Sequence, residues 1–116
     1  SAQLLNRVQV LTALHRKRER SPALRKKLIS LRQRRGPLKC DCCSTGSPPN
    51  ANALADAIFE AHHLMPLATV GETKTALTDM ALLCANCHRL IHRAMSISRE
   101  WVGVDQLKAL LGNQTG

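Results

Sequence analysis

The 116-residue chain has almost no aromatic residues, because Phe59 and Trp101 are the only two and tyrosine is absent. The core must therefore consist of aliphatic side chains, drawn from the 44% of residues that are apolar. A chain of this length is expected to form one domain and to bury only a modest share of its surface. Because small domains often depend on a disulfide or a metal ion for stability, the five cysteines and five histidines are the first candidates for such a site.

A long apolar run is also missing. No stretch approaches the roughly 18 apolar residues of a membrane-spanning helix, and the N-terminal residues lack the pattern of a secretory signal peptide. We therefore expect a cytoplasmic protein with reduced thiols and no membrane partner. A homodimer stays open at this stage, as do other domains of a longer parent protein beyond Ser1.

Acidic residues are nearly absent from the first third of the chain. Residues 1–39 contain 12 of the 17 lysines and arginines but one acid, Glu19, so they carry a net charge of +11, whereas the remainder carries −2. This segregation predicts a polyanionic partner. The same residues include no aromatic ring that could stack on unpaired bases. If the polyanion is a nucleic acid, this lack argues against readout of unpaired strands and favours a duplex contacted mainly through its phosphates.

Hydrophobic periodicity and turn residues predict a small α+β fold. Leucines at helical spacing between Leu4 and Leu14 predict a first amphipathic helix. Ser21 and Pro22 are typical of the start of a second helix, which Gly36 would end. The remaining elements are a loop over residues 40–52, strands over 58–64 and 81–83, and helices over 86–95 and 104–111. We expect three parts, namely a basic helical DNA-binding extension (1–38), a core (39–95) and a C-terminal helical tail (96–116).

Two cysteine pairs have the C-x2-C spacing of a metal site. Cys40 and Cys43 form the first pair, and Cys84 and Cys87 form the second. Two thiolates at this spacing can converge on one ion, and two such turns supply the four ligands of a tetrahedral structural zinc site. Disulfides or free buried thiols are the alternatives, and a reducing compartment disfavours the disulfides. Cys42 is left over, because its spacing suits the site less well.

The segment from Cys84 to His88 also satisfies the C-x-x-C-H pattern of c-type haem attachment. A haem would require export from the cytoplasm and an axial partner such as Met65 or Met95. It would also leave the first cysteine pair unexplained. Zinc is therefore the preferred interpretation.

Four of the five histidines fall into two clustered patterns. His62 and His63 are adjacent at the end of a predicted strand, so their side chains should point to opposite faces and suit different roles. His88 and His92 lie four residues apart on a predicted helix, so both imidazoles can reach one ion. His15, in the basic N-terminal segment, is interpreted as an ordinary histidine without a metal-binding role.

Two segments, Phe59–Leu67 and Leu77–Arg93, resemble the HNH nuclease motif. Their letters are FEAHHLMPL and LTDMALLCANCHRLIHR. With the upstream cysteine pair, the second segment looks like the McrA-like branch, the modified-DNA restriction endonucleases. The resemblance implies a ββα-metal core within residues 39–95. It also matches the family's structural zinc to four cysteines: Cys40, Cys43, Cys84 and Cys87.

The same resemblance implies a role for each histidine of the motif. His62 and His88 would bind the catalytic divalent metal ion, and His63 would be the general base. His92 would be a third ligand or a phosphate contact. The middle asparagine of the motif corresponds to Asp79. Because an ionised aspartate only accepts hydrogen bonds, whereas asparagine also donates them, Asp79 could hold its loop only through backbone N–H groups.

The chain is therefore predicted to be a metal-dependent endonuclease that hydrolyses double-stranded DNA, as the nuclease domain of a restriction-type enzyme. A neutral imidazole can deprotonate water near pH 7. The candidate catalytic ions are Mn²⁺, Ni²⁺, Co²⁺, Zn²⁺ and Mg²⁺, although imidazole ligands favour transition ions over Mg²⁺. The expected DNA contacts are Arg25, Lys26, Arg32, Arg35, Arg89 and Arg93. The alternative is a non-catalytic, zinc-stabilised nucleic-acid-binding module, which explains the charge and the cysteines but leaves the paired histidines unexplained.

Overall fold

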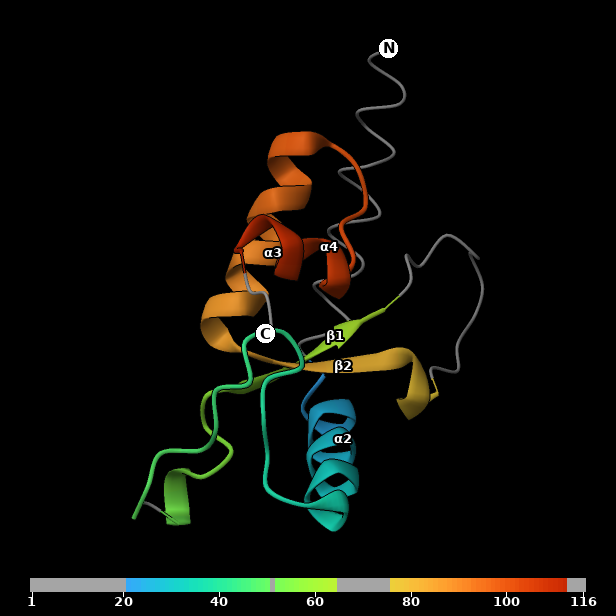
Figure 1. Cartoon of the computed structure of the whole chain (residues 1–116). Coiled ribbons are helices and arrows are strands. Elements are labelled where there is room, and N and C mark those ends of the chain that lie inside the picture. The colour runs from blue at the N-terminus through green and yellow to red at the C-terminus, as the bar shows by residue number, and fades with distance from the viewer. Residues whose placement is uncertain (1–20, 51, 65–75, 113–116) are drawn as a thin grey trace.

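The computed structural model describes residues 21–50, 52–64 and 76–112 (Figure 1). These residues form the small α+β fold that the sequence predicts, with a two-stranded antiparallel sheet between helices. The elements are α2 (Pro22–Arg35), η1 (Asn52–Leu54), β1 (Phe59–His63), η2 (Leu77–Asp79), β2 (Met80–Cys84), α3 (Ala85–Ser98) and α4 (Val104–Leu110). The helix predicted between Leu4 and Leu14, and His15, lie outside the described residues.

Helix α2 begins and ends where its cap residues predict. The hydroxyl oxygen of Ser21 accepts a hydrogen bond from the backbone N–H of Leu24 at 3.4 Å, and Pro22 occupies the first turn. Proline is tolerated there because the N–H that it lacks would have no partner within the helix. Gly36 follows the last residue with a φ of 140°, a conformation that favours glycine. The helix turns Leu28 and Ile29 into the core.

The β1–β2 hairpin lies at the centre of the fold. Its antiparallel register runs from Phe59 opposite Cys84 to His63 opposite Met80. All five residues of β2 are buried, because α2 packs against one side of the hairpin and α3 against the other (Figure 1). The core is largely aliphatic, as expected, with Phe59 the one phenylalanine within it.

Alternation along β1 separates the two adjacent histidines. Glu60 contacts His88 on α3. Because side chains two residues apart share a face of a strand, His62 lies on the same side as Glu60, whereas His63 lies on the other side. The predicted division of the two histidines between opposite faces therefore agrees with the strand that the structure contains. Both imidazoles are buried.

The chain reverses direction after α3 and packs a final helix against it. Arg99 adopts a left-handed conformation with a φ of 60°, and its N–H donates to the carbonyl of Met95 at 2.8 Å. Val102 is buried, and α4 adds Leu107 to the core. The helix ends just before Gly112, close to the predicted position. Over the described ranges, no helix combines the length and apolar character needed to cross a membrane.

Candidate metal centres and active site

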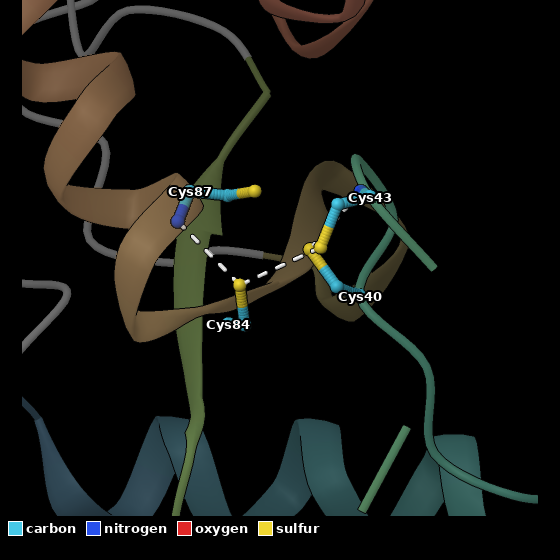
Figure 2. A group of neighbouring side chains, drawn as sticks. All are labelled: Cys40, Cys43, Cys84 and Cys87. Carbon is cyan, nitrogen blue, oxygen red and sulfur yellow. Dashed lines mark hydrogen bonds between the residues drawn. The ribbon is translucent and has the colours of Figure 1, made fainter. Parts of the chain in front are cut away.

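The four paired cysteines come together in one cluster, as their spacing predicts. Cys40 and Cys43 lie in a tight turn, whereas Cys84 ends β2 and Cys87 lies in the first turn of α3. Their four sulfur atoms lie within 4.8 Å of one another, and Figure 2 shows the two pairs facing each other. The segment between the pairs therefore folds so that ligands distant in sequence meet at one point.

The cluster has the geometry of a zinc site. The sulfur atoms of Cys43 and Cys84 lie 3.7 Å apart, and a tetrahedral ion with bonds of about 2.3 Å requires a separation of about 3.8 Å. Backbone N–H groups also point at the sulfurs. Those of Cys42 and Cys43 approach the sulfur of Cys40 at 3.4 and 3.5 Å, and that of Cys87 approaches the sulfur of Cys84 at 3.5 Å. Such donors stabilise thiolate charge, so the residues fit the ion.

The thiols differ in how easily they ionise. Burial alone would raise the pKa of Cys43, but hydrogen bonds to its sulfur, led by those from Thr45, lower it to about 7. Burial raises the pKa of Cys84, and burial together with neighbouring thiols raises that of Cys87 well above its ordinary value. A bound divalent cation would compensate the negative charge of four thiolates held this closely.

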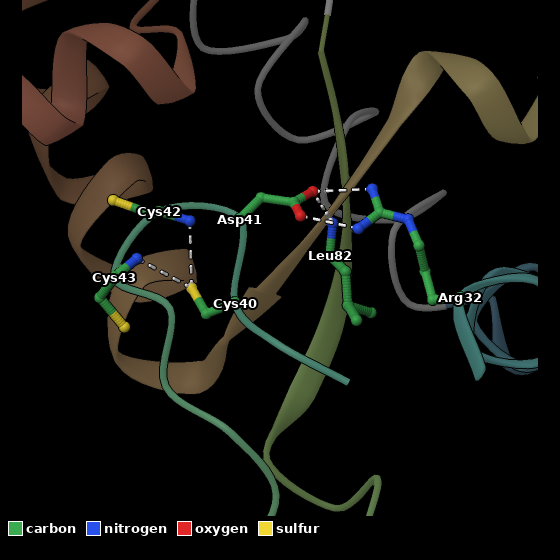
Figure 3. A network of polar contacts seen from close by, with 6 residues as sticks. All are labelled: Arg32, Cys40, Asp41, Cys42, Cys43 and Leu82. Carbon is green, nitrogen blue, oxygen red and sulfur yellow. Dashed lines mark hydrogen bonds and ion pairs between the residues drawn. The ribbon is translucent and has the colours of Figure 1, made fainter. Parts of the chain in front are cut away.

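Cys42 stands outside this cluster. It is buried, but its sulfur points away from the sulfurs of Cys40 and Cys43 (Figure 3). It is not a member of the set of four converging thiols. Burial raises its pKa, as it does for Cys84, so geometry alone separates Cys42 from the four ligands.

Asp41, which the sequence analysis did not single out, anchors the first cysteine turn. Its carboxylate accepts two hydrogen bonds from the guanidinium of Arg32, at 2.7 and 2.8 Å, and a third from the N–H of Leu82 at 2.9 Å (Figure 3). Its own N–H donates to the carbonyl of Leu82 at 2.8 Å. The hydrogen bond to Asp41 raises the pKa of Arg32. One carboxylate thus connects α2, the cysteine turn and β2.

Two of the six expected DNA contacts make bonds inside the fold. Arg32 binds Asp41, and Arg25 donates to the backbone carbonyls of Phe59 at 2.9 Å and Asp56 at 2.6 Å. These arginines hold α2 against the hairpin and the cysteine turn. The other four expected contacts are exposed, on α2 and α3; they are Lys26, Arg35, Arg89 and Arg93.

A second cluster contains three of the motif histidines. His62 on β1 meets His88 and His92, which lie one turn apart on α3, and one ring nitrogen from each lies within 4.8 Å of the others. The Nε2 atoms of His88 and His92 are 3.1 Å apart. A tetrahedral ion with bonds of about 2.0–2.1 Å holds its nitrogen ligands about 3.3 Å apart. Three convergent imidazoles therefore fit a divalent transition ion.

Glu60 contacts His88 on the side of the ring away from the cluster. A carboxylate oxygen of Glu60 contacts Nδ1 of His88, which directs Nε2 of the same ring toward His92. Metal-binding histidines commonly donate their second N–H to a carboxylate, which sets the ring orientation. The sequence contains a signal for this contact: Glu60 precedes His62 by two residues, so the two side chains share a face of the strand. The sequence-based prediction did not include Glu60.

His63 and Asp79 lie apart from the three histidines. His63, 3% exposed, pairs with Met80 in the hairpin and is not a member of the histidine cluster. Asp79 is exposed, and its carbonyl accepts a hydrogen bond from the N–H of Leu64 at 2.9 Å. Its own N–H donates to the carbonyl of Ala76 at 2.9 Å. The backbone of Asp79 thus connects the start of β2 to the end of β1.

The comparison with known families bears on this arrangement. Residues 40–94 match the model of the HNH endonuclease family. This HNH segment includes both cysteine pairs, Glu60 and the four histidines of the motif. Its match suggests a nuclease-type function, and HNH nucleases act on DNA. Helix α2 and the segment after α3 lie outside the matched residues. Searches of curated proteins and of solved structures found no match.

Proposed function

We propose that this chain is a metal-dependent endonuclease that hydrolyses phosphodiester bonds in double-stranded DNA. The observation that supports this most strongly is the convergence of His62, His88 and His92 inside the HNH segment, with Glu60 behind His88. A purely structural segment would not need three imidazoles aimed at one point beside a separate cysteine cluster. The cysteine cluster would bind a structural Zn²⁺ and contribute to folding stability.

Each motif residue has a proposed role in the reaction. His62, His88 and His92 would hold the catalytic ion, which would supply positive charge for the phosphate in the transition state. His63 would accept a proton from the attacking water, since an imidazole is partly neutral near pH 7. Asp79 would keep the strand ends together through its backbone. The donor set favours Mn²⁺, Ni²⁺, Co²⁺ or Zn²⁺ over Mg²⁺.

The exposed basic residues would hold the DNA backbone. Arg89 and Arg93 are exposed and lie four residues apart on α3, so both could contact the phosphates of a duplex bound along that face of the helix. Lys26 and Arg35 on α2 would extend the contact as part of a basic extension over residues 1–38. Residues 39–95 would form the nuclease core, and residues 96–116 the C-terminal tail.

We further propose a restriction-type role for the enzyme in the cytoplasm. The support is the resemblance of the segment Leu77–Arg93 to the McrA-like branch, whose members cleave modified DNA. The recognised base modification would be read by parts of the protein other than the metal centre.

The second candidate is a non-catalytic, zinc-stabilised DNA-binding module. The basic α2 and the cysteine cluster support it, but the histidine cluster does not. Plasmid nicking by purified protein with Mn²⁺, Ni²⁺, Co²⁺, Zn²⁺ or Mg²⁺, on modified and unmodified DNA, separates the two. Metal-dependent nicking that disappears in His63→Ala supports the enzyme. DNA binding without nicking in any of these metals supports the module.

A further inference from the structure

Trp101 lies against one of the three clustered histidines. The rings of Trp101 and His62 are stacked, with centroids 5.9 Å apart and planes inclined by 13°. His88 and His92 approach the same imidazole at steep angles of 73° and 82°, with centroids 5.4 and 5.3 Å away. The indole therefore covers a face of His62, while the other two histidines approach it at nearly right angles.

The segment after α3 holds the indole in place. Arg99 ends the helix and reverses the chain, and Val102, the residue after Trp101, is buried at 7% exposure. Gly103 then donates its N–H to the side-chain oxygen of Gln106 at 2.7 Å, which caps α4. The residue after Trp101 is thus anchored in the core, which fixes the backbone that carries the indole. This part of the chain lies outside the HNH segment.

We propose that Trp101 is a positioning residue of the histidine metal centre. The indole would hold the His62 ring in the orientation required for metal binding. It would also favour the metal-bound form, because a metal-bound imidazole is electron-poor and is attracted to the electron-rich face of an indole. This inference rests on the proposed function, which assigns a divalent ion to the three histidines.

The chain provides its own probe of this contact. Trp101 is the only tryptophan and there is no tyrosine, so its fluorescence can be excited alone. Ni²⁺ quenches nearby indoles. Titration of the zinc-loaded full chain with Ni²⁺ should quench Trp101 saturably at about one equivalent per chain, and His88→Ala should abolish that quenching. Calorimetry that shows Ni²⁺ bound at the histidines while Trp101 stays unquenched would overturn the proposed contact.

Two substitutions test whether Ni²⁺ binding depends on the aromatic face of Trp101 or only on the volume of its side chain. Calorimetric titration with Ni²⁺ should show affinity about three- to tenfold weaker in Trp101→Leu, the range expected for one aromatic contact. Trp101→Phe keeps an aromatic face and should stay within about twofold of the unchanged protein. Should the leucine variant lose its zinc, the phenylalanine variant and the quenching result still test the proposal. If Trp101→Phe binds Ni²⁺ as weakly as Trp101→Leu, the aromatic face is not required and the proposal fails.

Val102→Ala is the matched structural control. It removes a buried side chain next to Trp101 without removing the ring, so it should lower thermal stability while Ni²⁺ affinity stays within about twofold. If Val102→Ala and Trp101→Leu weaken Ni²⁺ binding equally at equal losses of thermal stability, general loosening of the tail explains both and the inference fails. Failure of the unchanged protein to bind any of the candidate ions at the histidines would overturn the proposed function itself, whereas equal Ni²⁺ binding by unchanged protein and Trp101→Leu would overturn only the role of Trp101.

Discussion

The carboxylate of Glu60 contacts Nδ1 of His88, on the side of the ring away from the Nε2 atom that approaches His92. One strand residue thereby orients a helix residue whose other nitrogen belongs to the histidine cluster. A carboxylate in this position makes the imidazole a better metal ligand and limits its rotation. The relationship joins β1 to α3 at the level of the proposed metal ion.

Glu60→Gln should therefore weaken binding of the divalent ion. The amide keeps the size of the side chain but removes the negative charge, so the expected loss of Ni²⁺ affinity is about 10- to 100-fold. Isothermal titration of the zinc-loaded protein measures it. The matched control is Glu100→Gln, an exposed acid just after α3, which should leave the affinity unchanged. Equal Ni²⁺ affinity in Glu60→Gln and the unchanged protein would remove the proposed role of Glu60.

The cysteine cluster should bind one Zn²⁺ that the fold requires. Cys84→Ser removes one of four ligands, so folded protein should contain far less than one zinc per chain and should unfold at lower temperature. Elemental analysis and circular dichroism measure the two effects. Cys42→Ser is the control, because Cys42 is not a member of the set of four converging thiols, and its zinc content should equal that of the unchanged protein. Loss of zinc in Cys42→Ser would mean that the ligand set is different.

Features that depend on nearby residues were predicted well from the sequence. The caps of α2 and the two C-x2-C turns arise from local backbone preferences, and the opposite faces of His62 and His63 follow from strand geometry. The contacts of Asp41 and Glu60 were not predicted. Each of these carboxylates acts on a residue of another element, so its partner depends on how the elements pack and leaves no regular spacing in the sequence.

The roles of individual basic residues also depend on how the elements pack, which the sequence does not show. A net charge of +11 over residues 1–39 indicates a polyanionic partner but does not distinguish a cation on the surface from one used within the fold. Arg25 and Arg32 look like Lys26 in the sequence, yet they bind a backbone and a carboxylate inside the chain. Only their hydrogen bonds in the structure distinguish these two arginines from a cation that is free to bind DNA.

His63→Ala should abolish DNA cleavage while metal binding persists. A general base is needed for proton transfer, whereas His63 is not in the histidine cluster that would hold the ion. Plasmid nicking and Ni²⁺ titration on the same preparations measure the two properties. His62→Ala is the companion variant and should lose affinity for the ion. The opposite result, with metal lost in His63→Ala and kept in His62→Ala, would exchange the two roles.

The ion pair between Arg32 and Asp41 should stabilise the fold and the cysteine turn. Asp41→Ala removes the acceptor of two charged hydrogen bonds and one backbone N–H bond. We expect a loss of about 1–3 kcal/mol in the free energy of unfolding. Chemical denaturation measures it. Arg35→Leu, an exposed residue on the same helix, should change that free energy little, and a double-mutant cycle of Arg32 and Asp41 should show clear coupling. Additive effects of the two single variants would argue against the pair.

Neutralising the four exposed basic residues should weaken binding to all duplex DNA alike. Each phosphate contact contributes about −0.9 to the slope of log affinity against log salt. Replacing Lys26, Arg35, Arg89 and Arg93 with glutamine should therefore flatten that slope by as much as about 3 to 4, as measured by fluorescence anisotropy with a labelled duplex. Arg25 and Arg32 stay in place because they hold α2 in the fold.

The contributions of the α2 pair and the α3 pair to cleavage can be measured independently, because the two helices cover opposite sides of the hairpin (Figure 1). Neutralising Arg89 and Arg93 on α3, beside the metal ligands, should reduce cleavage more than affinity alone explains. Neutralising Lys26 and Arg35 on α2 should reduce cleavage only as far as binding falls, a difference that saturating DNA would reveal. Lys108→Gln, on α4, is the charge-matched control and should leave the salt slope unchanged. A slope that stays constant in the fourfold variant, or a loss confined to one DNA sequence, would show that these residues do not bind the phosphate backbone.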